Sequence, residues 1–351
     1  MNGICRDNHF VAQMYFEPWK NNNNKIWTYD LVVPNEKSYL WNEKSIRSIA
    51  YQRDWYTRLE EGKEVDDIEK NLNEKFETPA SIPLKKTVKG ETLTDDDWEK
   101  IINYIGCQIV RTPSFASKLI NDENGILKNA FENGVKEIEQ KLKTISKDEI
   151  QSYSNNEKDD EYNKLFPLKV VDLGKSCEGD KKLIKIETIL GKSLYLYVIK
   201  FLLENSIKYL HKHTWKVIQL DERVKIPTSD DPVICLNYYS KNNYDFGGGW
   251  GNNGSEIIFP ISPSKIIYTK VGEKNIDFKP NYEMSITIKN IIIEHAYRRI
   301  FSVEKEKWIT KKRKRIVDKD IFEKDREMFN NWHRIYKEYE VKYLAHNDLR
   351  K

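Results

Sequence analysis

The chain has 351 residues, of which 39% are hydrophobic and 32% charged, and its 59 Lys and Arg nearly balance its 55 Asp and Glu. This apolar content suffices for a sizeable core, and the net charge of +4 excludes a polycation of the histone-tail type. We find no uncharged apolar run of about 18 residues and no signal-peptide core after Met1, so we expect no membrane association and a cytoplasmic location.

The first 60 residues read mostly as extended structure. Residues 26–33 form a strand candidate that ends at Pro34, and residues 44–50 alternate polar and apolar as a half-buried strand does. We therefore predict a hairpin region at the start of the chain.

Helices are predicted between residues 66 and 210. Residues 66–76 have apolar side chains spaced by four, and Thr94 provides an N-cap for an amphipathic helix that Pro113 ends or kinks. Residues 116–165 look helical and highly charged, with a loose charged insertion at about 130–165. Another long helix is expected from about residue 190 to residue 210.

A β-rich block comes next, and helices close the chain. The short strands predicted at 215–220, 232–236, 256–261 and 265–270 lie too close together for intervening helices, which favours an antiparallel sheet near 215–270. Helices are expected at 285–300 and 318–343. The whole pattern predicts an α+β fold in a single compact domain over residues 1–351.

No cofactor or metal motif stands out. Gly249, Gly251 and Gly254 match GxGxxG literally, but the nucleotide-binding version precedes a helix, and here a strand follows. We interpret residues 247–254 as a flexible Gly-rich loop between strands. The four cysteines form no CxxC pair, which argues against a disulfide framework or a zinc site. The cofactor and the metal requirement stay unknown.

The strongest local charge lies near the C-terminus. It is a run of five consecutive basic residues, namely Lys311, Lys312, Arg313, Lys314 and Arg315. Such runs are usually solvated helix faces; the alternative is a phosphate-contacting surface, with nucleic acid bound through residues 305–315. Trp308 beside the run could stack on a base or could anchor the segment to the core.

Aromatic residues recur along the last predicted helix. Phe322, Phe329, Tyr336 and Tyr343 are spaced by seven, with Trp332 and Tyr339 between them. An aromatic face packed on the protein's own core explains this spacing. The alternative is a helix pair that forms a homodimer through residues 318–343.

Three polar clusters are candidates for a functional site. His9 and Gln13 lie four residues apart, and Gln108 and Arg111 lie three apart near the end of a predicted helix. Ser229 and Asp230 precede a strand, where side chains can emerge at a sheet end, although the same residues also form ordinary turns. Turns and caps explain each cluster singly, whereas a functional site requires them to converge.

These clusters belong to a longer series of motifs. The series contains His9-x-x-x-Gln13 with aromatic residues after it, an Ile-Trp-x-Tyr-Asp strand at 26–30, Gln-x-x-Arg-Thr-Pro at 108–113, Thr-Ser-Asp-x-Pro-Val at 228–233 and Phe-Pro-x-Ser-Pro at 259–263. In these motifs and their order, the chain resembles the bacterial domain of unknown function 4238 family. It departs from that pattern in its charged insertion near 130–165 and in its Gly-rich loop. The resemblance implies family membership over nearly the whole chain and implies no reaction.

Three functions fit the pattern. The first is a nuclease-like enzyme acting on nucleic acid in bacterial defence or competition. In that enzyme His9 would exchange a proton, Asp230 would orient it or bind a metal, and Arg111 would neutralise a substrate phosphate. Gln13, Gln108 and Ser229 would hold the substrate. The second is a non-catalytic binding or regulatory module, and the third is an enzyme on a small phosphorylated ligand.

Overall fold

The computed structural model describes residues 3–60, 62–122, 168–175, 182–188 and 191–348, together with Gly125 and Gln140. The chain forms two compact units. Unit 1 contains Met1–Thr57, Asp66–Ala116 and Ile199–Trp332, and unit 2 contains Arg58–Val65, Ser117–Val198 and His333–Lys351. A single domain over residues 1–351 stays a prediction, because it concerns how the two units are placed together. Apart from Gln140, the charged insertion predicted at 130–165 lies outside the described residues.

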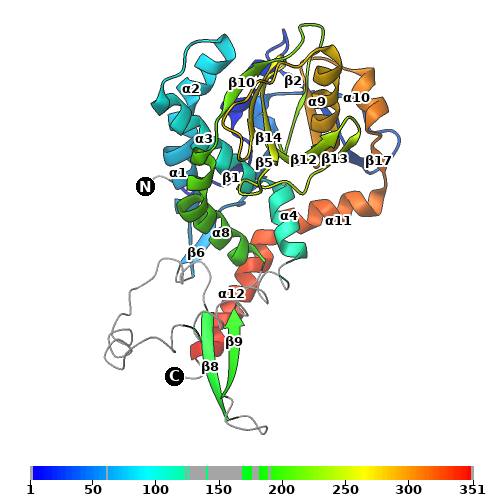
Figure 1. The fold of residues 1–351 in the computed structure, drawn as a ribbon. Coiled ribbons are helices and arrows are strands. Elements are labelled where there is room, and N and C mark those ends of the chain that lie inside the picture. Colours follow the sequence, from blue (N-terminus) through cyan, green and yellow to red (C-terminus); the bar gives the residue numbers. More distant parts are fainter. Residues whose placement is uncertain are drawn as a thin grey trace. The chain divides into compact units, whose positions relative to one another are not determined.

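The largest sheet of unit 1 is antiparallel and has five strands (Figure 1). In spatial order these are β10 (Lys216–Gln219), β15 (Lys265–Lys270), β14 (Glu256–Ser262), β12 (Ile234–Ser240) and β13 (Asn243–Asp245). The antiparallel sheet predicted near 215–270 is therefore confirmed.

Strand β14 is buried on both of its faces, so its sequence is almost continuously apolar. Successive side chains of a strand point to opposite faces. Ile257 and Phe259 accordingly join one hydrophobic cluster, while Ile258 joins a second cluster with Ile291 of helix α9 (Tyr282–His295).

The helices of the middle region begin with one long helical segment. α1 (Asp67–Leu72) continues through a π-helical turn, η3 (Asn73–Glu77), into α2 (Thr78–Lys89). Helix α3 (Asp95–Val110) follows the N-cap predicted at Thr94, where Thr94 and Asp97 form a reciprocal capping box. Lys86 of α2 binds Asp97 at 2.9 Å, which joins the two helices at this end. α4 (Pro113–Asn121) starts at the predicted break.

A second sheet joins distant parts of the chain. Its strands in spatial order are β11 (Thr228–Ser229), β16 (Arg299–Ser302), β2 (Ile26–Asp30) and β4 (Asn42–Lys44). The predicted strand at 44–50 is wrong beyond Lys44. The Ser45 side chain accepts a hydrogen bond from the Arg47 amide and caps the 3₁₀ turn η2 (Ile46–Ser48), an arrangement that competes with strand pairing.

Shorter elements complete unit 1. β1 (Asp7–His9) pairs with β5 (Tyr51–Arg53), and β3 (Val32–Val33) pairs in parallel with β17 (Ile316–Val317). Three further helices are the 3₁₀ helix η1 (Gln13–Trp19), α10 (Lys307–Lys312) and α11 (Lys319–Asn330). The long helix predicted up to residue 210 begins in unit 2 and changes type along its length, from α8 (Lys192–Phe201) to the π turn η4 (Leu202–Ser206) and the 3₁₀ turn η5 (Ile207–Lys212).

The continuous helix predicted at 318–343 is wrong. The chain breaks at Asn331, between α11 and α12 (Trp332–Asp348). In unit 1, the rings of Phe329 and Trp332 lie 5.2 and 4.7 Å from the ring of Trp55. These two aromatic residues therefore belong to the protein's own core.

Unit 2 contains two hairpins and a buried polar chain. The hairpins are β6 (Arg58–Glu60) with β7 (Lys63–Val65), and β8 (Leu168–Lys175) with β9 (Lys182–Thr188). Lys192 is buried with its Nζ atom 3.0 Å from Nδ1 of His333, whose Nε2 atom lies 3.0 Å from Oε1 of Glu64. Tyr336 is also buried in this unit, whereas Tyr339 is 59% exposed.

Candidate functional site

Arg111 lies at the C-cap of α3 with its side chain fully buried. Its Nη1 atom donates to Oε1 of Glu77 at 2.5 Å, and its Nη2 atom donates to the backbone carbonyl of His9. Its Nε atom lies 3.4 Å from the Tyr56 hydroxyl. The guanidinium thus joins three separate segments of unit 1 and has no exposed face.

Gln108 lies one helical turn before Arg111 and binds the same N-terminal segment. Its Nε2 atom donates to the carbonyl of Phe10 at 2.7 Å. Its Oε1 atom is buried and has no hydrogen-bond partner among the described residues. The two motif residues of α3 therefore bind the carbonyls of two consecutive residues, His9 and Phe10, so the first and second polar clusters do meet.

The His9 ring itself points elsewhere. Its Nε2 atom lies 3.3 Å from the carbonyl of Arg47, and its ring packs against Tyr51. Burial lowers the pKa of His9, which favours the neutral imidazole. The Gln13 side chain forms no hydrogen bond within the described part of the chain.

Two further polar side chains, Glu69 and Tyr104, interact electrostatically with Arg111. Burial raises the pKa of Glu69 to about 7, although the Arg111 charge opposes that rise. The Glu69 Oε2 atom and the Tyr104 hydroxyl are buried without a hydrogen-bond partner among the described residues. Within that same part of the chain, no three His, Cys, Asp or Glu residues gather as metal ligands would.

Asp230 binds backbone amides in the loop before β16. Its Oδ1 atom accepts from the Tyr297 amide at 3.0 Å, and its Oδ2 atom accepts from the Arg298 amide at 2.9 Å. Burial raises its pKa to about 6, while Arg299 and Arg298 oppose the rise. Ser229 accepts a hydrogen bond from the Asp231 amide. Through these contacts Asp230 holds its segment to the loop before β16, and Ser229 stabilises the turn before β12.

The Asp231 side chain contacts other residues than the Asp230 side chain does. Its Oδ1 atom accepts from the Thr112 hydroxyl at 3.2 Å, and its Oδ2 atom lies 3.7 Å from Nε2 of His295. The His295 Nδ1 atom lies 3.1 Å from the Asp231 carbonyl. The third polar cluster therefore reaches the second through Thr112, the residue after Arg111.

The structure thus joins the three clusters only in part. The Asp230 side chain has no hydrogen bond to His9, Gln13, Gln108 or Arg111 in the part of the chain that is described, so convergence of these side chains on one substrate stays a prediction. The candidate residues predicted from the sequence include neither His295 nor Asp231. A histidine at the last position of a helix, just before a strand, was the only available signal.

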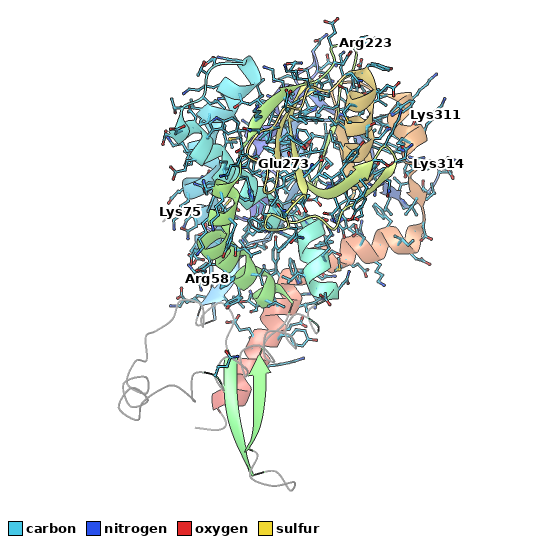
Figure 2. The ribbon with its side chains drawn as sticks, in the orientation of Figure 1. Arg58, Lys75, Arg223, Glu273, Lys311 and Lys314 are labelled. Carbon is cyan, nitrogen blue, oxygen red and sulfur yellow. The ribbon has the colours of Figure 1, made fainter. Side chains whose placement is uncertain are left out.

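The basic run is divided between internal contacts and solvent. Lys312 pairs with Glu294 at 2.7 Å, Arg313 donates to three carbonyls at the end of α9, and Arg315 donates to the carbonyl of Ser38. Lys311 and Lys314 are exposed and project outward beside α10 (Figure 2). Only part of the predicted cluster is therefore available to a partner.

These features define an α+β protein whose motif residues tie its N-terminal segment to α3 and to a second sheet. Residues 7–306 match the family described as Protein of unknown function (DUF4238), and the chain belongs to that family. The resemblance drawn from the motifs is confirmed. No curated protein and no solved structure gives a match. In the described residues, no helix is long and apolar enough to cross a membrane.

Proposed function

We propose that this chain is a cytoplasmic bacterial protein that binds nucleic acid through one exposed basic surface. This α10 surface is defined by four lysines and one tryptophan, namely Lys305, Lys307, Trp308, Lys311 and Lys314. It refines the sequence prediction for residues 305–315, because Lys312, Arg313 and Arg315 are engaged within the protein.

One observation carries the proposal. All four lysines are exposed, and none forms an ion pair with any described residue. Cations without ion-pair partners are free to neutralise phosphates and release counterions, which supplies sequence-independent affinity. Trp308 is 47% exposed while its Nε1 atom is held by Asn290 at 2.9 Å, so its ring is positioned for a base to stack on it.

The surface is firmly attached to the fold. Arg313 donates to the carbonyls of Ile293, Glu294 and Ala296, which are the free acceptors at the C-terminal end of α9. The Lys305 Nζ atom lies 4.2 Å from the centre of the Trp27 ring. Phosphate contacts made here would therefore meet a rigid element.

The test compares two triple variants of equal charge. Lys307→Gln/Lys311→Gln/Lys314→Gln should weaken binding of single-stranded RNA or DNA and reduce the slope of log affinity against log salt by about 2. Lys75→Gln/Lys274→Gln/Lys279→Gln removes three other exposed lysines and should leave the slope nearly unchanged. Equal slopes for both variants would reject the α10 surface.

A nuclease-like activity in defence or competition is the second candidate, and the pairing of His295 with Asp231 favours it. Because Arg313 binds the end of α9, the α10 surface is attached directly to the helix that carries His295. His295 would then act as the proton-transferring group with Asp231 as its orienting carboxylate, in place of His9 and Asp230. If the protein cleaves RNA, His295→Asn should abolish cleavage and retain binding, whereas His9→Asn should retain both cleavage and binding.

A further inference from the structure

A pocket of about 230 Å³ lies within unit 1, and its lining includes no residue of the three polar clusters or of α10. It is formed by the face of the five-stranded sheet at β12, β14 and β15, by residues 276–278 and by the first turns of α9. Ile258, Ile288 and Ile291 form its apolar floor. Such a space accommodates a ligand of a few heavy atoms.

Three aromatic rings line this pocket. The rings of Tyr268 and Phe278 stack with centres 4.8 Å apart, and Tyr268 is nearly fully buried. The third ring, Tyr238, lies parallel to Tyr244 at 6.4 Å. Aromatic faces carry partial negative charge and attract cations that lie over them.

The charged groups of the pocket have a net negative charge. Lys270 is paired with Glu273 at 2.9 Å, which leaves Glu256 and Asp277 as the excess acids. Glu256 accepts a hydrogen bond from Tyr268, and burial raises the pKa of Glu256, while this hydrogen bond and the Lys270 charge oppose the rise. A cation placed beside Glu256 would reduce the excess negative charge of the pocket.

We propose that this pocket binds a small organic ammonium ion, with its charge against Glu256 and the rings of Tyr238, Tyr268 and Phe278. The combination of stacked rings and a partly buried carboxylate supports a cation more than any other small ligand. A nucleobase would also stack on a ring face, but the phosphates of a nucleotide would meet Glu273 and Asp277. This inference does not depend on the α10 surface.

The experiment is calorimetric titration of the full chain with choline, with the uncharged analogue 3,3-dimethyl-1-butanol and with guanosine. We expect saturable binding of choline only. Glu256→Gln keeps the size of the side chain and its hydrogen bond to Tyr268 but removes the charge, and should weaken choline binding about tenfold or more. Phe278→Leu should weaken it as well, because a ring face is lost.

Glu283→Gln is the matched control, because Glu283 is exposed, pairs with Lys241 and does not line the pocket. It should bind choline as the unmodified protein does. Equal affinity for choline and its uncharged analogue would overturn the proposal, as would equal affinity in Glu256→Gln and Glu283→Gln. Binding of guanosine in preference to choline would make this a nucleobase pocket and would also overturn it.

Discussion

The guanidinium of Arg111 lies wholly inside unit 1, with its Nη1 atom 2.5 Å from Oε1 of Glu77. The π turn that interrupts the segment from α1 to α2 ends at Glu77 and so places this carboxylate. A buried charge that loses its partner is far more costly than the pair is favourable. Arg111 therefore acts through the fold rather than through an exposed phosphate contact.

The first prediction concerns this ion pair. Glu77→Gln should lower the free energy of unfolding by about 3 kcal/mol, because the buried Arg111 charge loses its compensation. Urea denaturation followed by circular dichroism measures the change. Glu74→Gln alters an exposed residue of the same turn and should change stability by less than about 0.5 kcal/mol. Equal losses in both variants would contradict a structural role for the pair.

The second prediction concerns pH and Glu69. The pKa of Glu69 is raised from 4.5 to about 7 in the folded protein, so the folded state holds its proton more tightly than the unfolded state. Its contribution to stability is complete below pH 4.5 and is lost as the pH rises through about 7. Glu69→Gln should therefore gain roughly 2–3 kcal/mol over the unmodified protein at pH 8 and little at pH 4. Urea midpoints for the two proteins at both values provide the test, and a pH-independent difference would refute it.

The third prediction separates core packing from dimer formation. Trp332→Ala should cost about 3–5 kcal/mol, since Trp332 packs on Trp55 in the core of unit 1. Tyr339→Ala removes an exposed ring and should leave stability almost unchanged. Size-exclusion chromatography with light scattering then tests the proposed homodimer through 318–343. If Tyr339→Ala converts a dimer to a monomer, α12 forms the interface.

The fourth prediction concerns the Gly-rich loop. A Cβ atom added at Gly248 would lie 2.6–2.8 Å from backbone atoms of Leu236, whereas one added at Gly251 would meet nothing within 4 Å. Gly248→Ala should therefore destabilise the protein by about 1–3 kcal/mol. Gly251→Ala should be neutral or slightly stabilising, because it restricts the unfolded chain. Thermal unfolding of both variants measures the difference, and similar melting temperatures would show that this loop does not pack on β12.

Local signals explain where the sequence predicted the fold well. The capping residue Thr94 and the closely spaced apolar runs within residues 256–270 act over a few neighbours, and both gave correct elements. The pairing of β2 with β16 and the break at Asn331 depend on packing between distant segments, so no local pattern revealed them. Ser45 shows the converse, because its side-chain cap outweighed an apparent strand pattern.

The candidate site was predictable only in part from the sequence. Gln108 and Arg111 were expected to meet the segment at His9, and they do so through its backbone carbonyls, which no side-chain pattern encodes. The contact between Asp231 and His295 spans 64 residues and involves a single histidine without a motif. Only the folded chain could reveal it.

The position of β2 has a consequence for biosynthesis. β2 lies between β4 and β16, so one of its edges has no partner until residues 299–302 have left the ribosome. An unpaired strand edge is a template for pairing with other chains, and contacts between distant segments form slowly. A nascent or truncated chain that ends before β16 therefore exposes an aggregation-prone edge, and we expect its yield to depend on chaperones that shield strands during translation.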